Sequence, residues 1–120
     1  MGFVFWSQKG EKSTVSVPEI QAEELKNRLD HGDDLVLLDV RDEYEYEISN
    51  IGGQLIPLPE LPKRLNELNA KQEIVTLCKM GPRGVKAVEI LQKKGFKRVS
   101  NLRGGIHAWS DRVDRSVRKY

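Results

Sequence analysis

The chain has 120 residues, of which 38% are hydrophobic and 32% are charged, and its formal net charge is +2. This balance is typical of one soluble globular domain and excludes a disordered or collagen-like chain. The single cysteine excludes an internal disulfide and fits a reducing, cytoplasmic setting.

The N-terminal segment reads as a lead-in rather than as part of the fold. Its apolar run Phe3-Val4-Phe5-Trp6 is too short for a signal-peptide core or a membrane span. We expect residues 1–17 to form this lead-in and residues 18–120 to form the domain. The run packs on the domain or frays, or alternatively it acts as an interaction patch.

Apolar spacing predicts the elements of the first half of the domain. Residues 22–31 predict a helix, with Leu25 and Leu29 on one face and Gly32 as its cap. The apolar run 35–38 is typical of a strand buried on both faces. A short helix over 42–47 and a short strand over 55–56 follow.

The second half continues the alternation. Residues 59–69 predict a helix, 74–77 a buried strand, 85–94 a helix closed by Gly95, 99–102 a strand and 106–109 a short helix. Strands that alternate with helices indicate an α/β fold, with a mostly parallel sheet and helices on both faces. Ligands of such folds bind beyond the carboxyl ends of the strands, which is where Cys78 lies.

The stretch CKMGPRG, residues 78–84, contains the only cysteine of the chain and is the candidate for a reactive site. Backbone N–H groups and the helix dipole there favour a thiolate on Cys78, and Lys79 and Arg83 add positive charge. Gly81 and Gly84 permit the backbone conformations that such a cradle needs. The alternative is a buried, inert cysteine.

Three longer stretches occur in the order seen in one known family. They are LLDVRDEYEYEISNIGGQLIPL, IVTLCKMGPRG and LQKKGFKRVSNLRGGIHAW. Together they resemble the signatures of rhodanese-type sulfurtransferase domains over residues 18–120. The stretch EISNIGGQLIPLPELPKRLNEL and the tail VDRSVRKY resemble one subgroup, the C-terminal rhodanese modules of the adenylyltransferase/sulfurtransferases that serve molybdopterin and related pathways.

The resemblance implies a role for each matching residue. Cys78 corresponds to the nucleophile that becomes a persulfide. The active-site loop consists of Lys79, Met80, Gly81, Pro82, Arg83 and Gly84. Arg83 is also a candidate for holding an anionic donor, because its guanidinium suits such a group. Asp39 and Arg41 match the family's Asp-x-Arg: Asp39 is expected to brace the loop, and Arg41 either faces the site or pairs with an acidic neighbour.

Loop length separates sulfur transfer from the related phosphatase chemistry. Cysteine-dependent phosphatases need a longer loop between their Cys and Arg, whereas only residues 79–82 separate Cys78 from Arg83. Two positions depart from the family pattern. Pro82 has no N–H to offer the cradle, and Gly84 stands where many relatives have a hydroxyl side chain.

We therefore predict a sulfurtransferase that moves sulfane sulfur from thiosulfate or a persulfide donor to a thiophilic acceptor. Its expected partners are the donor and a protein sulfur donor or small sulfur-carrier protein, with no metal, cofactor, nucleic acid or membrane. The alternative is a catalytically weak module that docks a protein or relays sulfur. Its binding features would be the Phe3–Trp6 run and the basic half, where residues 61–120 hold 15 Lys and Arg against 5 Asp and Glu.

Overall fold

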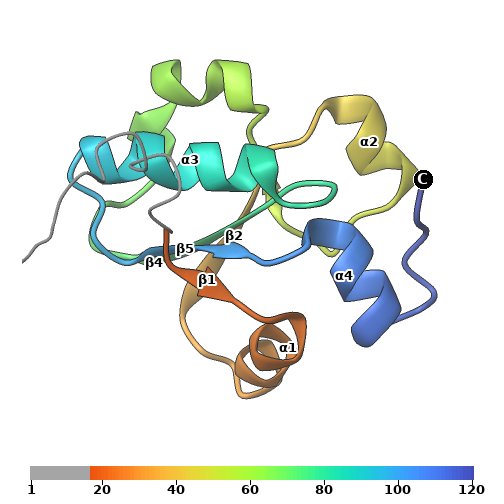
Figure 1. The fold of residues 1–120 in the computed structure, drawn as a ribbon. Helices are drawn as coiled ribbons and strands as arrows, with labels where there is room; N and C mark the ends of the chain where they lie inside the picture. Colours follow the sequence, from red (N-terminus) through yellow and green to blue (C-terminus); the bar gives the residue numbers. More distant parts are fainter. Residues whose placement is uncertain (1–16) are drawn as a thin grey trace, which may run out of the picture.

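The computed structural model describes residues 17–120, which form a five-stranded sheet in the order β1-β5-β4-β2-β3 (Figure 1). Every strand pair is parallel. The strands are β1 (Glu19–Ile20), β2 (Leu35–Asp39), β3 (Gln54–Leu55), β4 (Glu73–Leu77) and β5 (Val99–Leu102). The predicted α/β class with a parallel sheet is confirmed.

Helices cover both faces of the sheet, so the domain has three layers (Figure 1). On one face lie α1 (Ala22–Asp30) and α4 (Gly105–Arg112). On the other lie α3 (Pro82–Lys93) and the 3₁₀ helices η2 (Leu58–Lys63) and η3 (Leu65–Glu67). The short helix α2 (Glu43–Ile48) lies near α4, beside the C-terminal residues.

The apolar runs form central strands because both of their faces are buried. In β4, Ile74 packs into the core beneath α3, and Val75 packs into the core over α1 and α4. Both side chains are fully buried. This double burial explains the continuous apolar sequence of the strand.

The structure differs from the sequence prediction in three places. The single helix expected over 59–69 is η2 followed by η3, because Pro62 lies inside the first segment and cannot donate the hydrogen bond that an α-helix needs. Strand β1 was not predicted, since two residues carry no periodic signal. Val17, assigned to the lead-in, is buried in the core. The Phe3–Trp6 run lies outside the described residues.

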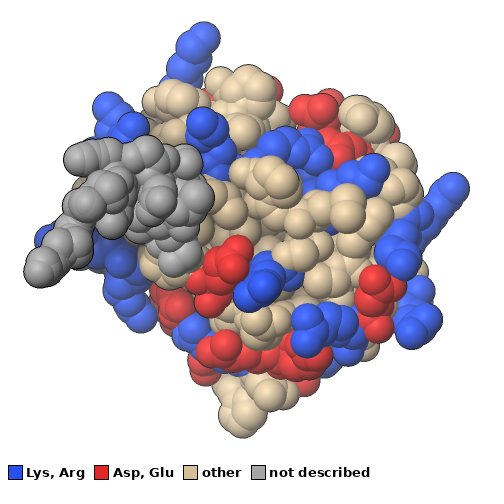
Figure 2. All heavy atoms as spheres, viewed as in Figure 1, with Lys and Arg blue, Asp and Glu red and all other residues tan. Residues whose placement is uncertain are grey.

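The charged residues do not divide the visible face of the molecule into two halves. On the face shown in Figure 2, Lys and Arg side chains lie interspersed with Asp and Glu. Within residues 17–120, no helix has the length and apolar composition needed to cross a lipid bilayer.

Candidate active site

Cys78 lies at the carboxyl end of β4, a strand that has neighbours on both sides in the sheet. The active-site loop, residues 78–84, runs from this strand into the first turn of α3 (Figure 1). The connection is short because Pro82 already occupies the start of the helix. Proline suits this position, since the first helical N–H has no partner within the helix. Pro82 therefore does not disturb the helix that follows the loop.

The sulfur of Cys78 accepts two backbone hydrogen bonds from its own loop. The N–H of Gly81 lies 3.1 Å from Sγ, and the N–H of Gly84 lies 3.3 Å from it. Gly81 adopts φ +131°, a conformation that side chains rarely permit, and so directs its N–H at the sulfur. The expected cradle is present, and its donors come from the two glycines.

The sulfur is almost completely enclosed. Cys78 is 1% exposed and contacts the apolar cluster beneath α3. A cysteine that only packs needs no hydrogen-bond donors, whereas two N–H groups stabilise negative charge on a sulfur. The geometry therefore combines a buried position with a polar environment suited to a thiolate or a persulfide.

Two buried side chains support the loop from the sheet below. Asn101 on β5 donates from Nδ2 to the carbonyl of Gly81 at 3.3 Å. Thr76 on β4 donates to the carbonyl of Gly84 at 2.9 Å, and its hydroxyl lies 3.1 Å from Oδ1 of Asn101. A Cβ at position 84 would overlap that Oδ1 atom. Asn101 thus occupies the space that a side chain at Gly84 would need.

The turn before α4 fixes the beginning of the loop. The N–H of Ile106 donates to the carbonyl of Cys78 at 2.8 Å, and the N–H of His107 donates to that of Lys79 at 3.1 Å. Gly105, with φ +62°, lies so close that a Cβ there would be 2.6 Å from the carbonyl carbon of Lys79. The second glycine of the LRGG segment is therefore required for this close approach.

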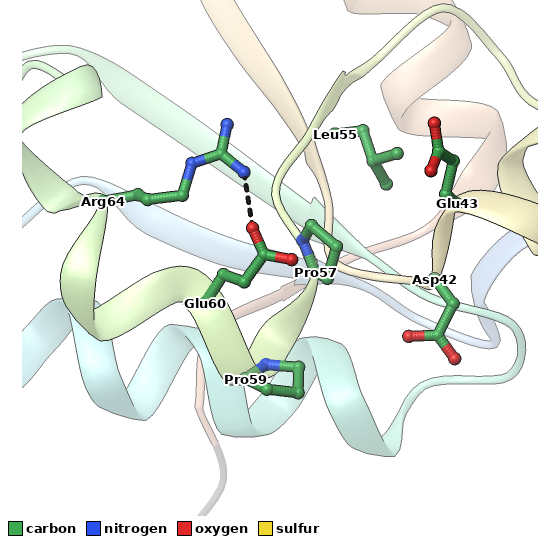
Figure 3. A pocket seen from close by; sticks show the side chains of 7 residues that line it. All are labelled: Asp42, Glu43, Leu55, Pro57, Pro59, Glu60 and Arg64. Atoms are coloured by element: carbon green, nitrogen blue, oxygen red, sulfur yellow. Dashed lines mark hydrogen bonds and ion pairs between the residues drawn. The ribbon is translucent and has the colours of Figure 1, made fainter.

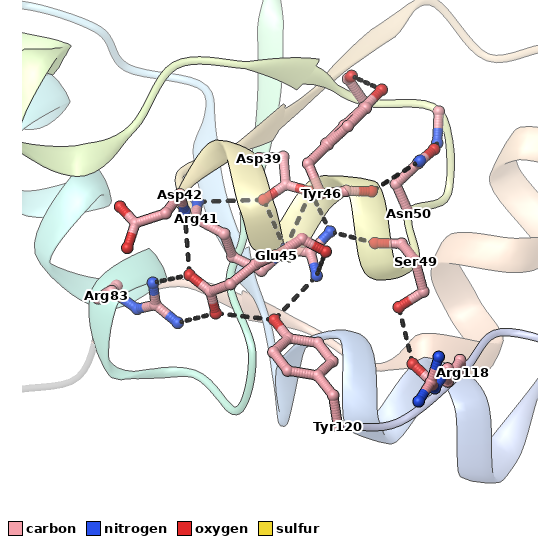
Figure 4. A network of polar contacts seen from close by, with 12 residues as sticks. Asp39, Arg41, Asp42, Glu45, Tyr46, Ser49, Asn50, Arg83, Arg118 and Tyr120 are labelled. Carbon is pink, nitrogen blue, oxygen red and sulfur yellow. Dashed lines mark hydrogen bonds and ion pairs between the residues drawn. The ribbon is translucent and has the colours of Figure 1, made fainter.

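A charged network borders the other side of the loop (Figure 4). Both oxygens of Glu45 accept hydrogen bonds from Arg83, at 2.7 and 2.9 Å. The hydroxyl of Tyr120 donates to Glu45 at 2.8 Å, and the backbone N–H of Asp42 donates to it at 3.0 Å. The hydrogen bonds from Arg83, followed by those from Asp42 and Tyr120, lower the pKa of Glu45 to about 2 despite its burial. Glu45 was not predicted as a site residue.

The predicted pair Asp39 and Arg41 forms a buried ion pair. Arg41 is fully buried and places Nε and Nη2 on the carboxylate of Asp39, with a shortest distance of 2.7 Å. It also donates to the carbonyl of Ser49 at 2.8 Å and to the hydroxyl of Tyr120 at 2.9 Å. Of the two alternatives for Arg41, the structure shows pairing with an acidic neighbour.

The remaining loop residues have different surroundings. Lys79 is half-buried, and its Nζ lies 4.9 Å from the centre of the Tyr120 ring in a cation–π contact. Met80 is 60% exposed. Both terminal nitrogens of Arg83 bond Glu45, so the role of Arg83 in holding a donor stays a prediction.

The part of the chain that the structure describes has no group of His, Cys, Asp and Glu that could hold a metal ion.

A hollow of about 380 Å³ lies outside the active-site loop (Figure 3). Its lining combines carboxylates, prolines and an arginine: Asp42, Glu43, Leu55, Pro57, Pro59, Glu60 and Arg64. Arg64 is paired with Glu60 at 2.8 Å. The lining includes no residue of the active-site loop, so the hollow is not the entrance to the sulfur.

Known proteins resemble this chain in sequence and in fold. The Bacillus subtilis protein YrkF, whose name describes it as a candidate sulfur carrier protein, is 40% identical over 92% of this chain and 62% of its own length. An Allochromatium vinosum protein named as a sulfurtransferase is 37% identical over 78% of this chain and 89% of its own. The crystal structure of a Staphylococcus aureus rhodanese-like domain protein matches with a TM-score of 0.75 and 31% identity, over 87% of this chain and 99% of that chain.

The subgroup suggested by the sequence is also among the relatives. MoeZ of Mycobacterium tuberculosis, whose name describes it as a candidate adenylyltransferase/sulfurtransferase, is 38% identical over 84% of this chain. This chain spans 26% of MoeZ. The family model of the rhodanese-like domain matches residues 21–112. The chain therefore belongs to the rhodanese-like domain family.

Proposed function

We propose that the protein is a sulfurtransferase that carries sulfane sulfur on Cys78 as a persulfide. The observation that carries this proposal is the pair of N–H donors on Sγ, from Gly81 and Gly84, at the carboxyl end of β4. The names of the relatives support sulfur transfer or sulfur carriage as the general activity.

The first half of the reaction loads the cysteine. The Cys78 thiolate attacks the outer sulfur of thiosulfate, a new S–S bond forms, and the old S–S bond breaks. Sulfite leaves with the electron pair of the broken bond. A persulfide donor reacts in the same way and releases its thiolate. In each case the loop N–H groups stabilise the negative sulfur.

The second half returns the enzyme to its starting state. A thiophilic acceptor, such as cyanide or a thiolate, attacks the outer sulfur of the persulfide. The S–S bond breaks, and its electron pair returns to Cys78 as a thiolate. No external oxidant or reductant is consumed. We propose a protein sulfur donor or a small sulfur-carrier protein as the partner in the cell, and a reducing cytoplasm as the setting.

One observation favours the second candidate, a catalytically weak module that docks a protein or relays sulfur. Cys78 is only 1% exposed, so a donor reaches the sulfur only after the groups around it move aside. A bound partner could supply that rearrangement, and turnover with small donors alone would then be slow.

Intact-protein mass spectrometry tests the proposal. Treatment with thiosulfate, or with a persulfide donor, should add the mass of one sulfur atom to the wild-type protein, and cyanide should remove it. The Cys78→Ser variant should gain nothing. A wild-type protein that gains no sulfur from either donor would contradict sulfurtransferase activity and favour the docking module. Hydrolysis of phosphate esters that depends on Cys78 would indicate a phosphatase instead.

A further inference from the structure

Arg83 is one of the two cations of the active-site loop, with Lys79, and its charge is matched by a carboxylate. It precedes Gly84, whose N–H bonds Sγ of Cys78. Its two terminal nitrogens form a two-point ion pair with Glu45 at 2.7 and 2.9 Å. The pKa of Arg83 is raised, mainly by these hydrogen bonds and to a smaller degree by the Cys78 sulfur. Arg83 is therefore close enough to the sulfur for an electrostatic interaction, but Glu45 already compensates its charge.

Glu45 cannot easily release Arg83. Its side chain is 4% exposed, and both oxygens have a second donor besides Arg83. One is the backbone N–H of Asp42, which closes the capping box at the start of α2. The other is the hydroxyl of Tyr120. Burial raises the pKa of Tyr120 to about 12, so this hydroxyl keeps its proton at neutral pH. Glu45 is therefore fixed as an anion beside the loop.

A second arginine in the same network is also neutralised. Arg41 pairs with Asp39 through Nε and Nη2, and its Nη1 donates to the Tyr120 hydroxyl. These two ion pairs, both drawn in Figure 4, contain two arginines and two carboxylates, whose charges cancel. Among the described residues, Lys79 is then the loop cation that no carboxylate compensates, and its Nζ lies over the Tyr120 ring.

We propose that Glu45 is a specificity-determining residue that selects sulfane-sulfur donors carrying a single negative charge over the thiosulfate dianion. This inference rests on the proposed function. By compensating Arg83, Glu45 removes one of the two positive charges of the loop side chains and so weakens the preference for two negative charges over one. Alkyl persulfides and thiosulfonates carry one charge and present the same reactive sulfur. The preferred class of donor is therefore the monoanion.

A series of four proteins tests the proposal, because it changes the charge beside the sulfur stepwise. Relative to wild type, Glu45→Gln adds one positive charge, Arg83→Gln removes one, and the double variant restores the original charge. The measurement is the ratio of kcat/KM for thiosulfate to kcat/KM for methanethiosulfonate, a monoanion. Since both donors react at the same sulfur, the ratio cancels general effects on Cys78.

The expected order of the ratio follows the charge. Glu45→Gln should raise it about three- to tenfold, and Arg83→Gln should lower it by a similar factor. The double variant should return close to wild type. All differences should shrink at high salt, because ions in solution screen the attraction between the partly exposed Arg83 and an approaching anionic donor. Circular dichroism of each variant identifies any protein that fails to fold.

Two outcomes would overturn the inference. If the double variant behaves like Arg83→Gln, then Arg83 binds the donor directly and Glu45 does not set the preference. If Glu45→Gln leaves the ratio unchanged, the charge of Glu45 has no role in donor choice. Failure of the underlying sulfurtransferase function looks different, since the wild-type protein would then form no persulfide with either donor.

Discussion

The active-site loop is held on two sides by contacts of opposite character. Its floor is neutral and buried: the side chains of Thr76 and Asn101, with the turn at Gly105. Its rim is charged: Glu45 and Arg83 with the hydroxyl of Tyr120. The floor contacts carbonyls of the loop backbone, whereas at the rim Glu45 and Tyr120 contact the loop side chains of Arg83 and Lys79.

The difference separates two requirements of a sulfur site. The floor fixes the loop backbone, which directs the N–H groups of Gly81 and Gly84 at the sulfur, and it does so without charge. Its contribution should therefore be insensitive to pH and salt. The rim sets the electrostatic surroundings of the sulfur and should respond to both. Substitutions in the floor should disrupt the geometry of the loop and lower stability. Substitutions in the rim should keep that geometry and change the electrostatic potential at the sulfur.

Gly105→Ala should have the largest effect on stability, because it adds a methyl group to the floor where the backbone at Gly105 contacts the backbone of Cys78 and Lys79. A methyl group there would meet the carbonyl groups of Cys78 and Lys79, and the residue would keep a φ of +62°. We expect the free energy of unfolding to fall by about 3 kcal/mol, with loss of persulfide formation. Urea denaturation measures the first and mass spectrometry the second.

Gly95→Ala is the matched control for backbone strain. Gly95 has φ +90°, but a Cβ there would meet nothing within 4 Å. The free energy of unfolding of this variant should fall by about 1 kcal/mol, which is the cost of the left-handed conformation for alanine. The variant should still form the persulfide. Equal losses in the two variants would show that close approach at Gly105 does not hold the loop.

Gly84→Ala should have an intermediate effect that depends on Asn101. The new methyl group would overlap Oδ1 of Asn101, and we expect a loss of about 2 kcal/mol in the free energy of unfolding. Asn101→Ala alone should lose about 1 kcal/mol, from its hydrogen bond to the carbonyl of Gly81. In the double variant the overlap disappears, so its loss should be smaller than the sum of the two by about 2 kcal/mol. Strictly additive losses would show that Asn101 does not occupy the space at position 84.

The floor and the rim also differ in how well the sequence predicted them. The apolar run at 74–77 predicted a strand that ends next to Cys78. The run is apolar because both faces of β4 are buried. The loop glycines followed from the spacing in CKMGPRG, and Gly105 was seen only as part of a family signature. These features are local in sequence, so a pattern can report them.

The residues that complete the site come from distant parts of the chain. Glu45 meets Arg83 across 38 positions, and Tyr120 meets Glu45 across 75. No local pattern in the sequence marks Glu45 or Tyr120 as a site residue. Glu45, for example, stands in an acidic stretch typical of a solvated helix. Asn101 was predicted only as part of a strand. Such contacts are set by the order of strands in the sheet and by the path of the tail, neither of which spacing alone reveals.

A further prediction distinguishes the rim from the floor by its dependence on pH and leaves stability at neutral pH out of the comparison. The folded pKa of Glu45 is about 2, below the ordinary 4.5. Its contribution to stability is therefore fully present above about pH 4.5 and is lost as the pH falls toward 2. Glu45→Gln should remove this contribution, so its free energy of unfolding should fall less steeply with acid, by up to about 1 kcal/mol per pH unit.

Urea denaturation at a series of pH values between 7 and 2 measures both slopes. Glu60→Gln is the control, because Glu60 lies on the surface with a side chain 55% exposed and pairs with Arg64 outside the active-site loop. An exposed pair contributes little, so this variant should keep the wild-type slope. Asn101→Ala should keep it too, since the floor holds no titratable group. A Glu45→Gln protein with the wild-type slope would show that the rim does not carry the acid sensitivity of the loop.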